Sequence, residues 1–102
     1  MNSHSEGYGS IAIGKGAHAE GGTQYIGADA YLGGYAYGEG SHAEGAQTSA
    51  IGTFSHAEGA YTLASGLQAH AEGIRTIASG GRSHAEGYEC IASGLYSHAN
   101  GQ

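Results

Sequence analysis

The sequence of 102 residues contains no proline, no tryptophan, a single cysteine and only three basic residues. Because Cys90 has no second cysteine to pair with, no intrachain disulfide stabilises the chain. Glycine occurs 21 times, but without proline or a three-residue period the chain is not a collagen helix. The formal net charge of −6 is unsuited to neutralising a phosphate backbone, and we expect no nucleic-acid partner.

Large apolar side chains are also scarce. Seven isoleucines, four leucines, one phenylalanine and eight tyrosines are too few for a conventional core, so we expect chains to associate. No apolar run is long enough to span a membrane, and residues 1–5 lack the character of a signal peptide. The repeat described below stops one residue after Gly101, before the next unit is complete, so we expect the chain to be an excerpt of a longer protein.

The sequence does have a strict internal repeat. A motif close to Ser-His-Ala-Glu-Gly recurs every fourteen residues, and an Ala-x-Gly unit recurs every seven. The register breaks once, because Gly21 and Gly38 are seventeen residues apart. We predict one repeat domain over residues 1–102, with first coils over 1–21, degenerate coils and a bulged loop over 22–35, and regular coils over 36–102.

A seven-residue period is also typical of coiled coils, but those need apolar a and d positions, and here the fixed residues are alanine and glycine. In a strand, side chains alternate, so in residues 48–52 Thr48, Ala50 and Gly52 point one way and Ser49 and Ile51 the other. We expect the two residues after each glycine to form a corner, where glycine supplies backbone freedom. Two units then form one 14-residue coil with two strands, and stacked coils form two parallel sheets around small residues.

The outward residues differ between the two predicted sheets. One sheet carries a polar ladder of His-x-Glu pairs, repeated from His18 and Glu20 to His98 and Asn100. The other carries an apolar stripe, and such a stripe on a thin solenoid marks an association surface. The stripe consists of Ile11, Ile13, Tyr35, Tyr37, Ile51, Leu63, Ile77 and Ile91.

The units Ser10-Ile11-Ala12-Ile13-Gly14 and Ala17-His18-Ala19-Glu20-Gly21 resemble the head repeat of YadA-type trimeric autotransporter adhesins. The Ser-His-Ala-Glu-Gly motif also resembles repeats in phage and prophage tail fibres. The resemblance implies a left-handed parallel β-roll, with three copies side by side and the apolar stripe as the trimer interface. Ser65, Ser79 and Ser93 stand where the family often has isoleucine, so we expect a more polar trimer axis here.

The His-x-Glu pairs offer zinc ligands, but every coil offers the same pair, whereas an active site is normally a unique constellation. This favours a solvated polar ladder on which any zinc or nickel is weak and adventitious, and whose fold survives chelation. No Gly-x-Ser-x-Gly serine or phosphate-binding loop is present. We therefore predict no enzyme, no catalytic or metal site and no cofactor, and we assign Cys90 to the buried column that holds Thr48, Thr62 and Thr76.

Together with these patterns, the resemblance implies a structural, non-enzymatic segment of a homotrimeric fibre or adhesin head, located outside the cell on a phage virion fibre or a bacterial surface. Such a segment forms a stiff rod that presents a surface for attachment to a host or receptor. The alternative is a head that binds a receptor or glycan directly. It would use the His/Glu face or the irregular segment, with Tyr25 and Tyr31 as candidate contacts. The corner residues Phe54, Tyr61, Tyr88 and Tyr96 are expected to cover gaps between protomers.

Overall fold

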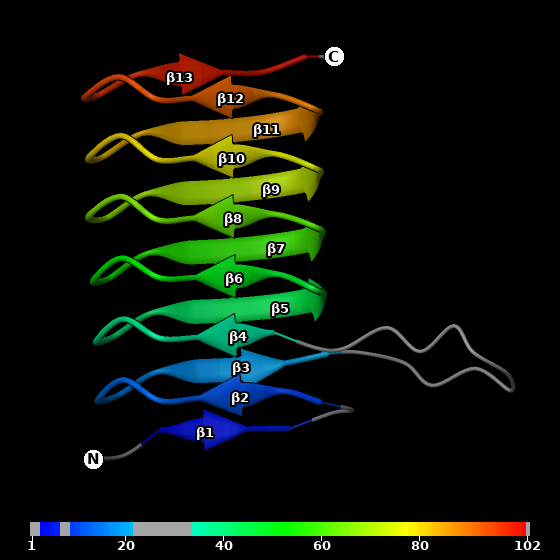
Figure 1. Ribbon diagram of the computed structural model, residues 1–102, viewed down its shortest axis with the longest axis vertical. Coiled ribbons are helices and arrows are strands. Elements are labelled where there is room, and N and C mark those ends of the chain that lie inside the picture. Colours follow the sequence, from blue (N-terminus) through cyan, green and yellow to red (C-terminus); the bar gives the residue numbers. More distant parts are fainter. Residues whose placement is uncertain (1–2, 7–8, 22–33, 102) are drawn as a thin grey trace, which may run out of the picture.

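The computed structural model describes residues 3–6, 9–21 and 34–101, which form a stack of coils with two strands each (Figure 1). Odd-numbered strands form one seven-stranded sheet, which we call the long-strand sheet: β1 (His4–Ser5), β3 (His18–Glu20), β5 (His42–Ala46), β7 (His56–Ala60), β9 (His70–Ile74), β11 (His84–Tyr88) and β13 (His98–Ala99). Even-numbered strands form the six-stranded short-strand sheet: β2 (Ile11–Ala12), β4 (Tyr35–Ala36), β6 (Ser49–Ala50), β8 (Leu63–Ala64), β10 (Ile77–Ala78) and β12 (Ile91–Ala92).

All neighbouring strands are parallel, and each residue pairs with the residue at the same place in the next coil. His56 pairs with His70 and Ala57 with Ala71 in the long-strand sheet, and Leu63 pairs with Ile77 in the short-strand sheet. The prediction of an all-β parallel solenoid, with 14-residue coils and two sheets, is therefore confirmed. Handedness and the trimer stay predictions. Among the described residues, no helix has the length and apolar character needed to cross a membrane.

The space between the sheets is filled by alanine, serine and threonine. Ala43, Ala57 and Ala71 are 0 % exposed, and the largest fully buried side chains are threonines and serines such as Thr48 and Ser55. Because these side chains are small, the Cα trace extends only 13 Å along its shortest axis. The predicted inward column is confirmed, and Cys90 is buried in the threonine column as expected.

The glycines serve two different purposes. Strand β7 runs through Gly59 to Ala60, so the prediction that the corner begins directly after the glycine is wrong for the long-strand sheet. Gly59 has a φ of 106°, which L side chains rarely adopt. A Cβ on Gly59 would also overlap the carbonyl oxygen of Gly73 in the next coil. Gly52 has no such φ and is required for the steric reason alone, because a Cβ there would overlap the carbonyl oxygen of Gly66.

The corners contain a feature that the sequence pattern did not reveal. In the described corners, the second residue after the glycine of an Ala-x-Gly unit is in the left-handed region, and at eight of these positions it is not glycine, with φ between 55° and 62°. The coils hold this conformation by hydrogen bonds between stacked corners: Tyr61 N donates to Ala46 O over 2.9 Å, and Phe54 N donates to Glu39 O over 2.8 Å. The eight residues are Gln47, Phe54, Tyr61, Gln68, Arg75, Arg82, Glu89 and Tyr96.

The stack keeps its register across the break in the repeat. Strand β2 pairs directly with β4, and β3 pairs directly with β5, so regular pairing resumes at Tyr35, one residue before the predicted boundary. The two sides of the break are also joined directly, because Gly34 N donates a hydrogen bond to Glu20 O over 3.2 Å. Of the predicted irregular segment 22–35, residues 22–33, including Tyr25 and Tyr31, lie outside the described residues.

Candidate functional site on the long-strand sheet

The outer face of the long-strand sheet carries one histidine and one glutamate per coil. In β7, Ala57 is buried while His56 and Glu58 on either side of it point outward, because side chains alternate along a strand. Parallel pairing in register then places like residues above one another. We call the resulting surface the His/Glu ladder, which consists of His18, Glu20, His42, Glu44, His56, Glu58, His70, Glu72, His84, Glu86 and His98.

The imidazoles form a regular stack. Ring centroids lie 4.7 Å apart between His42 and His56 and 4.6 Å apart between His56 and His70, with interplanar angles of 3° and 2°. The spacing matches the separation of neighbouring strands, so the predicted histidine row is confirmed. The stack ends less regularly at His4, whose ring is tilted by 43° against His18.

Each imidazole of the ladder except that of His98, whose coil has Asn100 in place of glutamate, also contacts the carboxylate two residues further along its strand. The distance from His Nε2 to Glu Oε1 is 3.1 Å for His42 and Glu44 and 3.3 Å for His84 and Glu86. In addition, His84 Nε2 lies 3.9 Å from Oε2 of Glu72 in the preceding coil. The Nε2 atoms of His42, His56, His70 and His84 are shielded from solvent but are not aligned for a hydrogen bond.

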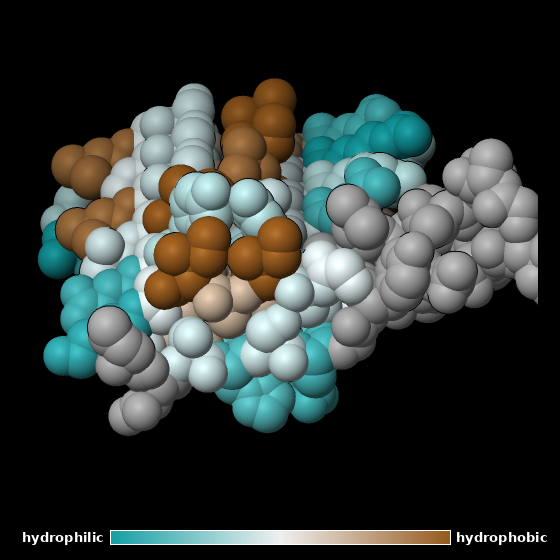
Figure 2. Space-filling model, turned by 60° about the horizontal axis from the view of Figure 1, so that its bottom comes forward, coloured by the Kyte–Doolittle hydropathy of each residue, from teal (hydrophilic) through white to brown (hydrophobic). Residues whose placement is uncertain are grey.

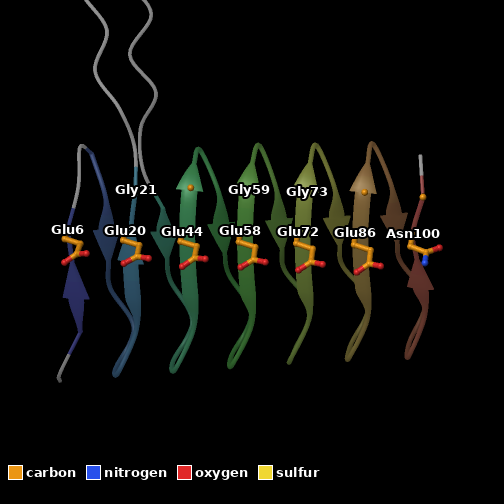
Figure 3. A pocket seen from close by; sticks show the side chains of 13 residues that line it. Glu6, Glu20, Gly21, Glu44, Glu58, Gly59, Glu72, Gly73, Glu86 and Asn100 are labelled. Atoms are coloured by element: carbon orange, nitrogen blue, oxygen red, sulfur yellow. The ribbon is translucent and has the colours of Figure 1, made fainter.

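The carboxyl groups form a row of their own (Figure 3), and Glu44 and Glu58 each lie beside the histidine of their own strand. Hydrogen bonding to Glu72, partial burial and hydrogen bonding to Glu44 raise the pKa of Glu58 to about 7. The hydrogen bond with Glu58 lowers the pKa of Glu72. Burial acts to raise the pKa of Glu44, but hydrogen bonds with Glu20 and Glu58 lower it overall. Neighbouring carboxyls therefore share protons.

The imidazoles of the central coils resist protonation. Burial lowers the pKa of His56, and the nearby His70 and His42 rings lower it further. Burial and the neighbouring His84 lower the pKa of His70 in the same way. Half-buried rings stacked this closely disfavour a second positive charge, so the neutral forms of His56 and His70 are favoured.

An open groove runs along the ladder, and the sequence analysis did not anticipate it. Figure 3 shows the glutamate side chains that line this groove in a row along the stack, with Asn100 at the end of the row. Glycine follows each glutamate, and the absence of a side chain there leaves the trough; this is the signal from which the groove was predictable. The lining residues are Glu6, Glu20, Glu44, Glu58, Glu72, Glu86, Asn100, Gly21, Gly45, Gly59, Gly73, Gly87 and Gly101.

The outer face of the short-strand sheet is chemically different. Ile13 and Ile91 are 57 % and 61 % exposed in the single chain, and Leu63 and Ile77 are half-buried. The hydroxyls of Tyr35 and Tyr37 lie 3.1 Å apart, and this hydrogen bond raises the pKa of Tyr35. Figure 2 shows hydrophobic and hydrophilic residues gathered into separate groups along the stack.

The corners carry exposed aromatic rings and two arginines. The Arg82 guanidinium lies 5.7 Å from the ring centroid of Tyr96, donates to its hydroxyl over 2.8 Å and donates to Gln68 Oε1 over 2.7 Å. At the opposite corner, Arg75 lies 5.9 Å from the Tyr61 ring centroid. The arginines thus connect successive coils, a role that the sequence analysis did not assign to them.

These features define a two-sheet parallel β-solenoid with a small-residue interior and chemically distinct outer faces. The family model for the YadA head domain repeat (2 copies) matches residues 2–22, 33–55, 43–69, 57–83 and 71–97. The chain therefore belongs to the YadA head repeat family, as the resemblance of its motifs indicated. Comparison with curated proteins found no match.

Proposed function

We propose that this chain is a structural, non-enzymatic segment of a trimeric fibre or adhesin head. The observation that carries the proposal is the unbroken stack. In this stack every coil hydrogen-bonds in register to the next, and one outer face alone bears the apolar stripe. A stack of this kind makes a stiff rod, because stability in a solenoid comes from contacts between adjacent repeats.

The apolar stripe supports the trimer. Its predicted interface residues are Ile11, Ile13, Tyr35, Tyr37, Ile51, Leu63, Ile77 and Ile91, and five of them are exposed in the single chain: Ile11, Ile13, Tyr37, Ile51 and Ile91. Packing three stripes around a common axis removes this apolar surface from water. We assign the left-handed β-roll and the three-fold axis to this chain from its family.

The family also supports a location outside the cell, because YadA heads are surface-exposed parts of adhesins. In this setting the rod presents a surface for attachment to a host receptor or glycan. The ladder repeats one pair of groups in every coil, and this repetition suits a surface better than it suits an active site.

Sedimentation equilibrium tests the trimer. The parent chain should sediment as three chains per particle. Ile51→Asp, which places a carboxylate in the stripe, should shift the equilibrium toward monomer, because a charge buried at an apolar interface is strongly disfavoured. Ile74→Asp is the matched control on the long-strand sheet, where Ile74 ends β9 and is 46 % exposed, and it should remain trimeric. A well-folded parent monomer at micromolar concentration would overturn the assignment.

A further inference from the structure

We propose that the His/Glu ladder is a row of zinc sites, each built from the histidine and glutamate of one coil and the histidine of the next. The sequence favours a ladder whose metal binding is weak and adventitious. The structure adds a geometry that the sequence does not contain. The inference concerns the solvent face of a single chain, so its test is separate from the test of the trimer.

The first element of this geometry is the separation of the ligand atoms. At bond lengths of ~2.0–2.1 Å, two ligands of a tetrahedral zinc ion lie about 3.3–3.4 Å apart. The Nε2 to Oε1 distance is 3.2 Å for His56 with Glu58 and 3.2 Å for His70 with Glu72. Each His-x-Glu pair is therefore already close to the spacing of two zinc ligands.

The second element is a third ligand from the neighbouring coil. Five groups bring one ligand atom from each of two histidines and one glutamate within 4.8 Å of one another. They begin at His18 and end at His98, and each takes its glutamate from the earlier coil. Two imidazoles, one carboxylate and one water is a ligand set that suits four-coordinate zinc. The five groups are His18-Glu20-His42, His42-Glu44-His56, His56-Glu58-His70, His70-Glu72-His84 and His84-Glu86-His98.

The third element is the availability of the nitrogen atoms. Four central Nε2 atoms are shielded from solvent and make no hydrogen bond, and their nearest polar neighbours are the carboxylates that would share the ion. The carboxylate row beside them contributes negative charge, which attracts a divalent cation into the groove. Binding needs both rings to rotate, since stacked rings 4.6 Å apart with an interplanar angle of 2° direct their nitrogen lone pairs side by side and must turn toward a shared ion.

Neighbouring sites exclude one another. An imidazole Nε2 has a single lone pair, so each histidine can serve only one metal ion at this atom. The six histidines from His18 to His98 therefore fill in pairs, and full loading gives at most three ions per chain. The three ions use Glu20, Glu58 and Glu86, whereas Glu44 and Glu72 belong to the excluded sites.

This alternation gives a test with an internal control. The full 102-residue chain, freed of metal, is titrated with zinc ions alone at neutral pH, and the stoichiometry is checked by elemental analysis. We expect saturation at three ions per chain for the parent. Glu58→Gln should saturate at two, because no arrangement of the remaining four groups gives three. Glu72→Gln, the same change one coil away, should still saturate at three.

Circular dichroism confirms that each variant is folded before titration. Loading with cobalt adds a second readout, since tetrahedral sites should give a strong visible absorption in the parent that falls by about a third in Glu58→Gln. Non-saturating binding in the parent would mean an adventitious ion only and would overturn the proposal. Equal stoichiometries in the two variants would overturn it as well.

Discussion

At the scale of the residue, the carboxyl row shows how stacking in register changes the chemistry of a single side chain. An isolated glutamate is ionised at neutral pH, but Glu58 lies between two like groups and its pKa rises to about 7 through hydrogen bonds with Glu72 and Glu44. A parallel ladder necessarily creates such neighbours, because it places each carboxyl beside its own repeat. The protein accommodates them by sharing protons and by placing an imidazole next to each carboxyl.

This shared proton predicts a pH dependence. Because the pKa of Glu58 in the folded chain lies above its ordinary value, the group contributes stability that is fully present below its unfolded pKa. This contribution is lost as pH rises through about 7. The amide introduced by Glu58→Gln would keep a hydrogen-bond donor at this position at all pH values. The melting temperature of Glu58→Gln relative to the parent should therefore rise between acidic and mildly alkaline pH, measured in chelator to keep metal out.

Glu39→Gln is the control for this prediction, because Glu39 is an exposed corner residue away from the ladder. Its melting temperature should follow that of the parent across the same pH range. If the Glu58→Gln and Glu39→Gln variants shift alike, the carboxyl row does not hold a proton at Glu58.

At the scale of the element, the small side chains between the two sheets allow the strands of one sheet to lie close to those of the other. Ala71 in β9 is 0 % exposed and faces the opposite sheet across a layer of alanine, serine and threonine. A larger side chain in this column has no room unless the sheets move apart. Since neighbouring coils share the same separation, a local displacement would disturb pairing in the coils above and below it.

Ala71→Leu should therefore lower stability much more than Leu67→Ala does. Overpacking a tight interior costs about 1–3 kcal/mol in ordinary cores, whereas Leu67 lies at a corner and is 51 % exposed. Thermal melts of the two variants, and of the equivalent pair Ala85→Leu and Leu95→Ala, compare the two positions directly. An Ala71→Leu protein that melts like the parent would show that the alanine column does not set the sheet separation.

The corners show where sequence reasoning fails at this scale. The alanine and glycine columns repeat without variation, so their period identified the strands and the inward face. The left-handed positions vary freely between Phe54, Gln68, Arg82 and Tyr96, and no residue type marks their conformation. It is imposed by hydrogen bonds from the neighbouring corner, a tertiary interaction that local propensity does not describe.

At the scale of the whole molecule too, features that follow from the repeat pattern were predictable, and features that follow from contacts between coils were not. The sheets, coil length and polar and apolar faces follow from a period of seven residues and its alternation, which the sequence shows directly. The raised pKa of Glu58 and the hydrogen bonds between stacked corners depend on the spacing of adjacent coils. They appear only when the coils are stacked. The outcome of the register break also required the structure, which pairs β3 directly with β5.

The whole stack should tolerate the loss of one complete coil. Deleting residues 57–70 joins His56 to Ala71, so every column continues with its own residue type: His56 is followed by His84, and Thr48 by Thr76. Stability in a solenoid is close to a sum over repeats and their contacts, so this shortened chain should fold and remain trimeric with a modestly lower melting temperature.

Deleting half a coil should have a different effect. Removing residues 57–63 keeps the seven-residue period of alanine and glycine, but it moves His70 and Glu72 onto the short-strand sheet and Ile77 onto the long-strand sheet. The apolar stripe is then split between two faces, and the glycines that need a φ above 100°, such as Gly73, exchange places with those that do not. We expect this chain to lose the trimer in sedimentation equilibrium and to melt well below the chain that lacks residues 57–70. If the two shortened chains behave alike, then the seven-residue unit alone determines the assembly, and the difference between the two outer faces has no part in it.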